Sequence, residues 1–298
     1  AGGERLRQAI GERTLTRSIK WLVEPAHRYV AGETSAIVSA LEGDGPRPHR
    51  RPLTVAAVGV GGRPTVVLNA ETSAHLALIA RFGAQWFRGA GSPDCPGSTL
   101  VTIVGNAPGS GTVVEIGAPV TIGELLVSAA GISRTPRAVL LGGYAGTWIP
   151  GDAAMRTPLE RGLLSRIGTP LGCGLVGVLD AEDCGVAETA RMFRWLAGQS
   201  SGQCGPCVLG LPAISELLDD LVEGVANHGD VRRLAGLAAS VRGRGACGHP
   251  TAAVGLVESA LETFRAEVRL HRRGTRCEAR GAEIGFPLPP PAKHGKFS

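Results

Sequence analysis

The spacing of apolar residues predicts a first region, up to residue 98, that mixes helices with short strands. Apolar residues recur at helical spacing in two clear segments, 35–41 and 71–87, and more weakly at 4–11. Short β-like runs occur at 17–23 and 65–68. Loops rich in Gly, Pro and Arg separate these segments, so each predicted element is short.

Residues 99–146 have a different pattern. Four elements are predicted there in the order strand, strand, helix, strand, at 100–104, 112–116, 121–130 and 138–143. Thr121 is the expected N-cap of the helix, and Glu124, three positions later, completes a capping box. Strands and a helix in this order within about 50 residues outline a β-grasp unit.

The rest of the chain is mainly helical. After a short helix at 158–168 and a buried strand at 175–179, the apolar spacing predicts four further helices, near 186–197, 208–223, 229–241 and 250–268. Short loops join them, which favours a small antiparallel bundle. The residues after Gly274 are basic and then Pro-rich, and we expect a mobile tail there.

Composition narrows the class of protein. The chain has 298 residues, 43% of them hydrophobic and 19% charged, as expected for a globular protein of several domains. No apolar run is long enough to span a membrane and no signal peptide is evident, so we expect a cytoplasmic protein. The net charge of +5 comes mainly from arginine, but aromatic residues make up only 4%, which argues against nucleic acid as a partner. The basic tail favours an acidic partner such as a ferredoxin.

The cysteine spacing carries the chemistry. Cys204 and Cys207 form a CxxC motif, and Cys247 follows 40 positions after the second cysteine. Thiolates at this spacing can hold a metal or an iron–sulfur cluster from a tight turn and a distant loop. Buried structural thiols are the alternative, but the Gly and Pro between Cys204 and Cys207 shape a turn that directs both sulfurs to one side.

A fourth ligand is not evident from the motif. A [4Fe–4S] cluster takes four thiolates, and the position three residues before Cys204 is Ser201. Ser201 can ligate through its oxygen, while Cys184 and Cys277 are alternatives if the fold brings them near. A three-iron cluster without a fourth ligand is a further possibility.

These motifs, taken in order, resemble the flavoprotein subunit of respiratory complex I, the NADH-quinone oxidoreductase family. The segments that carry the resemblance are the cysteine motif with Cys247, the soluble-ligand-binding β-grasp signature at 105–117, and the segments 29–33, 41–48, 62–72 and 171–174. The resemblance covers roughly residues 17 to 270. It implies a divergent, N-terminally truncated member of the family.

The resemblance implies an α+β multidomain fold with a C-terminal four-helix iron–sulfur bundle. The expected domains are a partial FMN/nucleotide-binding α/β domain, the β-grasp domain, a return to the α/β domain, the helical cluster domain and a basic, Pro-rich tail, at 1–98, 99–146, 147–182, 183–270 and 271–298. The cluster ligands would be Cys204, Cys207, Cys247 and Ser201. The family's cofactor site would fall on Tyr29, Gly32, Glu33, Asn69 and Thr72, although helix or turn caps explain Glu33, Asn69 and Thr72 equally well.

Four departures from the family pattern limit what the resemblance implies. The glycine-rich loop that cradles the FMN phosphate would precede residue 1, so we expect this chain to retain FMN poorly. Thr34 replaces the second of two glutamates, and Thr54 replaces an aromatic residue that would stack on nicotinamide. We therefore do not expect direct NADH oxidation. Ser201 in place of a cysteine is the fourth departure.

The implied function is electron transfer between FMN and a [4Fe–4S] cluster, with other redox subunits or a ferredoxin as partners. The chain would have no membrane span but can lie at the periphery of a membrane complex. The alternative is a non-catalytic binding or assembly module, in which the β-grasp domain binds a partner and three cysteines with His249 hold a structural zinc. Whether the chain is an enzyme stays open between these hypotheses. Neither includes a catalytic acid or base.

Overall fold

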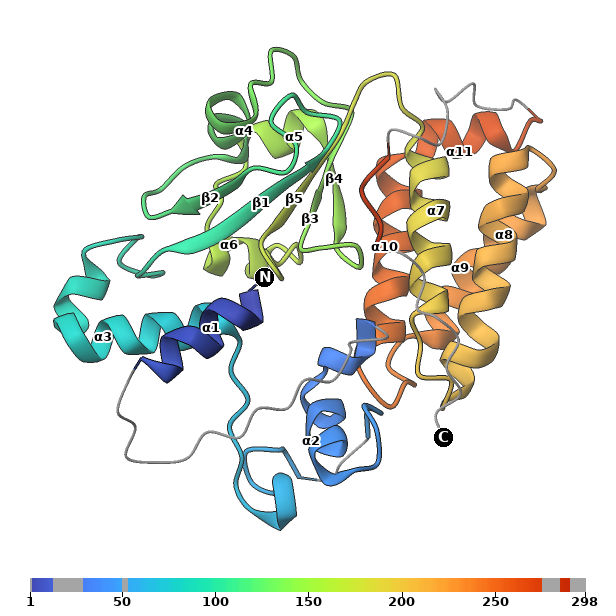
Figure 1. Cartoon of the computed structure of the whole chain (residues 1–298). Coiled ribbons are helices and arrows are strands. Elements are labelled where there is room, and N and C mark those ends of the chain that lie inside the picture. The colour runs from blue at the N-terminus through green and yellow to red at the C-terminus, as the bar shows by residue number, and fades with distance from the viewer. Residues whose placement is uncertain (1, 13–28, 50–52, 275–284, 290–298) are drawn as a thin grey trace.

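A computed structural model describes residues 2–12, 29–49, 53–274 and 285–289 (Figure 1). A sheet with its own helices and a helical bundle lie beside each other, and the first three α-helices lie apart from the sheet (Figure 1). In the part that the structure describes, no helix has the length and apolar character needed to cross a bilayer.

The sheet of the described chain has five strands. They are β1 (Thr99–Gly105), β2 (Val113–Ile116), β3 (Ala138–Leu141), β4 (Thr147–Pro150) and β5 (Leu175–Leu179), in the spatial order β2-β1-β5-β3-β4. The central strand, β5, runs parallel to β1 and antiparallel to β3. The strands predicted within 99–146 form, but the sheet extends past residue 146 because β4 and β5 complete it. Residues 147–182, which were expected to return to the α/β domain, thus contribute β4 and β5 to the same sheet.

Side chains alternate between the two faces of the sheet, and each face packs against its own apolar core. Val139 and Leu141 of β3 pack with α4 (Ile122–Ala130) and α5 (Gly151–Arg156), whereas Leu140, on the other face, packs with the bundle. All four residues of β3 are buried for this reason. Neither β4 nor α5 was predicted, because each is too short to show a clear periodic spacing of apolar residues. The predicted helix at 158–168 is shorter, as α6 (Arg161–Arg166).

The helices predicted after residue 185 form and pack on one another as a bundle, with one break. Its helices are α7 (Gly185–Gly198), α8 (Leu211–Glu223), α9 (His228–Val241), α10 (His249–Thr263) and the short α11 (Arg265–His271). The predicted single helix at 250–268 is split at Phe264, whose buried ring packs on Trp148 of β4 with ring centroids 5.2 Å apart. The backbone N–H of Trp148 donates to the Ser259 hydroxyl at 3.1 Å, so α10 is fixed to the edge of the sheet.

The elements before the sheet are helical wherever the structure describes them. They are α1 (Gly2–Gly11), η1 (Tyr29–Gly32), α2 (Thr34–Glu42), η2 (Val60–Gly62) and α3 (Ala70–Arg88). The strand predicted at 65–68 does not form, and the one predicted at 17–23 lies outside the described residues. None of the residues of α3 is buried, although Leu76, Phe82 and Trp86 are large and apolar. No named strand lies in the described residues before β1, and the partial α/β domain expected at 1–98 stays a prediction.

The capping box of α4 generates a prediction about acid stability. The Thr121 hydroxyl accepts the Glu124 N–H at 3.1 Å, and the Glu124 carboxylate accepts the Thr121 N–H at 2.7 Å, which lowers the pKa of Glu124. Because the folded pKa is depressed, this contribution to stability is present above the usual pKa of glutamate and is lost as the pH falls through the lowered pKa. Glu124→Gln should therefore lower the urea midpoint at pH 7, and the difference from the parent chain should shrink toward pH 3.

The matched control is Glu216→Gln, an exposed glutamate in the middle of α8. It should leave the urea midpoint nearly unchanged across the same pH range. A constant difference between Glu124→Gln and the parent chain from pH 7 to pH 3 would contradict the role assigned to the Glu124 carboxylate.

Candidate functional site

The CxxC motif lies where the chain enters the second helix of the bundle. After α7 a short loop leads to Cys204, and the next turn, Pro206–Gly210, is a π-helical turn that continues into α8. The Cys204 carbonyl accepts the N–H groups of Cys207 and Val208, both at 3.0 Å. Such wide single turns are rare and occur often at functional sites. Here the turn fixes the backbone between the two cysteines.

The three predicted cysteine ligands influence one another electrostatically. Cys207 is buried, and burial, the charge and hydrogen bond of Cys204, and the charge of Cys247 raise its pKa to about 12. Burial also raises the pKa of Cys247, the backbone N–H of His249 opposes this, and the charges of Glu33 and Cys204 add to it. The folded chain therefore brings the three sulfurs to one end of the bundle and disfavours the thiolates of Cys207 and Cys247 in the absence of a cation.

Ser201, the residue predicted at the fourth position, belongs to the same loop. Its hydroxyl accepts the Gln203 amide N–H at 2.8 Å, and that same amide donates to the Pro48 carbonyl at 3.3 Å. Gln203 thus connects the cysteine loop to the segment that follows α2. Ser201 is half-buried and is the nearest hydroxyl to Cys204 along the chain.

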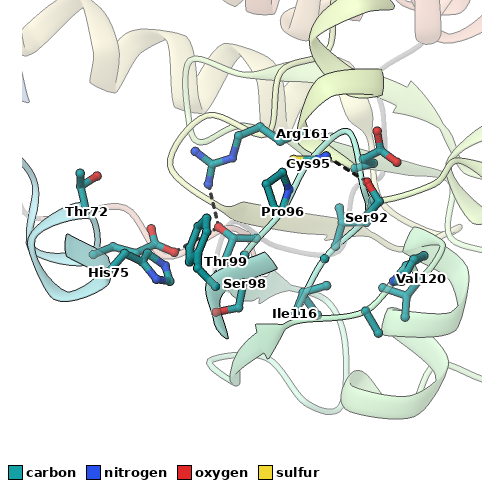
Figure 2. Close-up of a pocket in the computed structure, with 18 of the residues that line it drawn as sticks. Thr72, His75, Ser92, Cys95, Pro96, Ser98, Thr99, Ile116, Val120 and Arg161 are labelled. Carbon is teal, nitrogen blue, oxygen red and sulfur yellow. Dashed lines mark hydrogen bonds between the residues drawn. The ribbon is translucent and has the colours of Figure 1, made fainter. Parts of the chain in front are cut away.

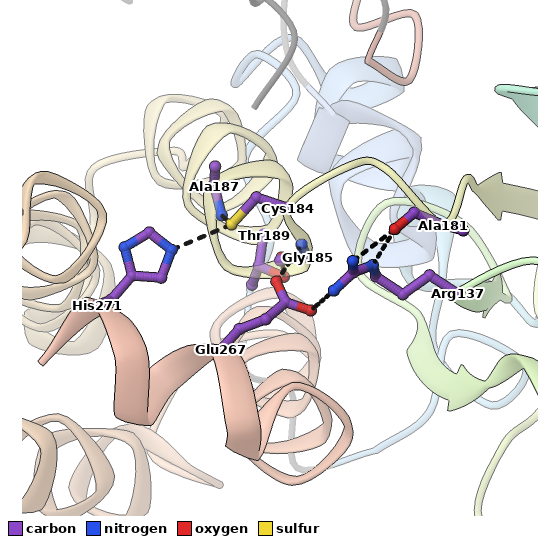
Figure 3. Close-up of polar contacts among 8 residues, drawn as sticks. All are labelled: Arg137, Ala181, Cys184, Gly185, Ala187, Thr189, Glu267 and His271. Atoms are coloured by element: carbon purple, nitrogen blue, oxygen red, sulfur yellow. Dashed lines mark hydrogen bonds and ion pairs between the residues drawn. The ribbon is translucent and has the colours of Figure 1, made fainter. Parts of the chain in front are cut away.

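Cys184, an alternative fourth ligand, lies at the other end of α7 (Figure 3). Its sulfur caps that helix, accepting the Ala187 N–H at 3.3 Å, and lies 3.2 Å from Nε2 of His271. A helix of 14 residues is about 20 Å long, so Cys184 is not placed to complete a site with Cys204. Cys277, the other alternative, lies outside the described residues.

His249, named above as a zinc ligand, is buried although it is the first residue of α10. Its Nε2 lies 3.0 Å from the Leu196 carbonyl, an acceptor, so Nε2 carries the proton. Burial lowers the pKa of His249. Within the described ranges no set of three or more His, Cys, Asp or Glu side chains is arranged to hold a single metal ion. This observation gives no support to the zinc site of Cys204, Cys207, Cys247 and His249.

Three of the five predicted cofactor residues lie beside this end of the bundle. Tyr29 is half-exposed; its N–H donates to the Gln199 side chain at 3.0 Å, and its ring centroid is 5.7 Å from that of His249. Partial burial, and then the charge of Cys173, raise the pKa of Tyr29. Gly32 ends η1. Glu33 is the N-cap of α2 and accepts the N–H of Ser35 at 2.9 Å and that of Ala36 at 3.1 Å.

The other two, Asn69 and Thr72, lie in a different place. Asn69 is the N-cap of α3, and its side-chain oxygen accepts the Thr72 N–H at 2.7 Å. Both residues line a pocket of about 390 Å³ between α3, the loop before β1 and the start of α6 (Figure 2). Helices α2 and α3 are well separated (Figure 1). The structure therefore divides the predicted cofactor residues between two locations.

Sequence reasoning missed the residues that complete this pocket. Arg161 donates to the Thr99 hydroxyl at 2.8 Å, and Glu71 accepts the Thr99 hydroxyl at 3.1 Å and the Leu100 N–H at 2.8 Å. His75 faces the same pocket, and its Nδ1 is buried without a hydrogen-bond partner. These residues come from three separate segments and follow no motif, so the sequence contains no signal that groups them.

Glu71 generates a prediction about the attachment of α3. Because α3 buries none of its residues, the bonds from Glu71 to β1 should contribute strongly to holding its first turn. Glu71→Ala should cost about 1–2 kcal/mol locally and speed hydrogen exchange in 70–75 by roughly tenfold. Glu71→Gln keeps an acceptor oxygen and should have a smaller effect.

The control for Glu71 is Glu160→Ala, which removes another carboxylate from the lining of the same pocket. Hydrogen exchange in residues 70–75, measured by mass spectrometry, is compared between the two variants. Equal acceleration in α3 for both substitutions would show that the pocket's charge, rather than the tie to β1, holds the helix.

Comparison with known proteins identifies the family. The family model of the NADH-ubiquinone oxidoreductase-F iron-sulfur binding region matches residues 187–271, which contain the cysteine loop and the bundle. The NADH-quinone oxidoreductase F subunit of Mycobacterium tuberculosis (strain H37Rv) is 30% identical over 85% of this chain. The chain belongs to the family of NADH-quinone oxidoreductase F subunits. It spans 57% of the length of that relative.

Two further proteins show the range of similar chains. The NADP-reducing hydrogenase subunit HndC of Solidesulfovibrio fructosivorans is 26% identical over 85% of this chain and 52% of its own length. One chain in the crystal structure of an NAD⁺-reducing [NiFe]-hydrogenase in the H₂-reduced state is 32% identical in sequence. The match has a TM-score of 0.74 and covers 82% of this chain and 42% of the hydrogenase chain. The predicted family is thus confirmed, and the fold is shared with a chain of that hydrogenase.

Proposed function

We propose that this F-family chain is an electron-transfer subunit that binds a [4Fe–4S] cluster through Cys204, Cys207, Cys247 and Ser201. The observation that carries the proposal is the meeting of three mutually interacting thiols at a π-turn inside the matched region 187–271. When bound, the cluster would accept and release one electron at a time.

The donor set fits a cluster better than a single ion. Cysteine thiolates are the usual ligands of iron–sulfur clusters. Because a cluster is larger than one metal ion, its ligands lie farther apart than those of a single-ion site. The charge of Cys204 raises the pKa of both Cys207 and Cys247, yet no described set of side chains is arranged around one ion. Iron would supply positive charge beside the thiolates of Cys207, which is buried, and Cys247, which is partly buried.

Neighbouring residues have defined tasks at this site. The backbone N–H of His249 donates to the Cys247 sulfur, which favours its thiolate form and orients it. The π-turn sets the direction of Cys204 and Cys207, and burial of Cys207 keeps water from its sulfur. Ser201 would bring an oxygen, a harder donor than sulfur, to the fourth position.

The flavin part of the family's chemistry has less support in this chain. Glu33 and Asn69 are occupied as helix caps, and the five predicted cofactor residues do not lie together. The described residues do not by themselves fit FMN, so the electron transfer proposed for this chain involves the cluster alone. Donors and acceptors of the electrons are proposed to be other redox subunits or a ferredoxin, because relatives of this chain are named as subunits of NADH-quinone oxidoreductases and hydrogenases.

Metal analysis of anaerobically purified protein tests the cluster. The parent chain should contain about four irons and four sulfides, with an EPR signal after reduction by dithionite. Cys207→Ala and Cys247→Ala should lose most of the iron. Cys184→Ala, at the far end of α7, and Cys173→Ala, an exposed cysteine, are matched controls and should keep it. Zinc in place of iron, or no metal in the parent chain, would refute the proposal.

Ser201 is tested separately. Ser201→Cys should keep four irons and shift the reduction potential, because a thiolate replaces a harder oxygen ligand. Ser201→Ala should yield about three irons and an EPR signal in the oxidised state, since one corner of the cluster is left without a protein ligand. Identical spectra for the parent chain and Ser201→Ala would exclude Ser201 as a ligand.

A further inference from the structure

The carboxyl-terminal strap, residues 285–289, lies between the sheet and the bundle (Figure 1, short dark-red segment). Its sequence is Gly-Phe-Pro-Leu-Pro. The sequence pattern predicted only a mobile tail in this region. In the structure the strap is anchored by Phe286, of which 2% is exposed.

The anchor fills a pocket that only glycine can form. The Phe286 ring lies over β1 and β5, where a Cβ atom on Gly177 would lie 2.3 Å from it and one on Gly105 would lie 2.8 Å from it. Trp148 closes one side, with ring centroids 5.7 Å apart. The floor of this pocket is therefore backbone, and an aromatic ring can pack directly against the sheet.

The backbone of the strap is held by side chains of one face of α7. The Phe286 N–H donates to Glu188 at 2.9 Å, and Arg191 donates to the Phe286 carbonyl at 2.5 Å. One turn further, Trp195 Nε1 donates to the Pro289 carbonyl at 2.9 Å. Residues at i, i+3 and i+7 share a helix face, so α7 presents an acceptor and two donors in a row.

A tyrosine from the sheet side completes the groove. The Tyr144 hydroxyl donates to the Pro287 carbonyl, and its ring contacts Trp195 with centroids 5.6 Å apart. Proline-rich segments dock in aromatic-lined grooves of this kind, and little entropy is lost because proline restricts the free peptide. The groove thus contacts individual backbone groups of a short segment as well as its aromatic ring.

We propose that this groove is a binding site for peptides of the Phe-Pro-x-Pro type and that the strap is its resident ligand. The same groove borders the candidate redox end, because Trp195 also contacts Tyr29, with ring centroids 5.9 Å apart. Bound strap holds Trp195 in place against Tyr29. Release of the strap frees the groove for a proline-containing segment of a partner.

The strap's own attachment determines how the site must be tested. A ligand within the same chain has an effective concentration on the order of millimolar, so a free peptide competes poorly with it. Phe286→Ala in the full chain removes the anchor and leaves every groove residue unchanged. Phe286→Leu is a milder variant that serves if the alanine variant does not fold.

The experiment measures binding of a fluorescein-labelled Gly-Phe-Pro-Leu-Pro peptide by fluorescence polarisation. The peptide should bind the Phe286→Ala chain at least tenfold more tightly than the parent chain. A control peptide with alanine in place of phenylalanine should bind neither chain. Trp195→Phe, introduced together with Phe286→Ala, should weaken binding because the donor to the last carbonyl is lost.

A second readout follows the groove directly. The Trp195 indole N–H resonance, assigned by its absence in Trp195→Phe, should shift in Phe286→Ala and return when the peptide is added. Equal affinity for the parent and variant chains, equal binding of the control peptide, or an indole resonance that does not respond in a folded Phe286→Ala chain would each overturn the proposal.

Discussion

One carboxylate, that of Glu267, joins the start of α7 to the sheet. One of its oxygens accepts the Gly185 N–H at the start of α7 at 2.8 Å, and the other pairs with Arg137, beside β3, at 2.6 Å (Figure 3). A carboxylate at a helix N-terminus is favoured by the helix dipole, and here it also joins the bundle to the sheet. Because α7 is a rigid rod, fixing this end also sets where its other end delivers the cysteine loop.

The far end of α7 gathers the candidate redox residues. The Leu196 carbonyl meets His249, the first residue of the long helix α10, and Gln199 accepts the N–H of Tyr29. Contacts from two distant parts of the chain therefore converge on the last turn of one helix. A shift of α7 along its axis would move the cysteine loop, the buried histidine and the tyrosine together, so the sheet and the proposed cluster site are mechanically linked.

The region before the sheet is organised by different forces. The bundle and the sheet bury continuous apolar cores, whereas α3 buries none of its residues and depends on polar ties such as Glu71 to β1. Residues that the family resemblance assigned to a cofactor, Glu33 and Asn69, are first of all helix caps here. A cap and a ligand contact can use the same side chain, but local capping alone accounts for these two.

Features that depend on near neighbours along the chain could be predicted from the amino-acid sequence. The capping box of Thr121 and Glu124, the helices of the bundle and the CxxC turn belong to this group, because each involves residues within a few positions of one another. Other contacts required the folded molecule. Folding placed β5 in the centre of the sheet, paired Cys184 with His271 across 87 positions and seated Pro287 on Tyr144 across 143. Such partners leave no periodic signal, because they meet only when separate elements pack.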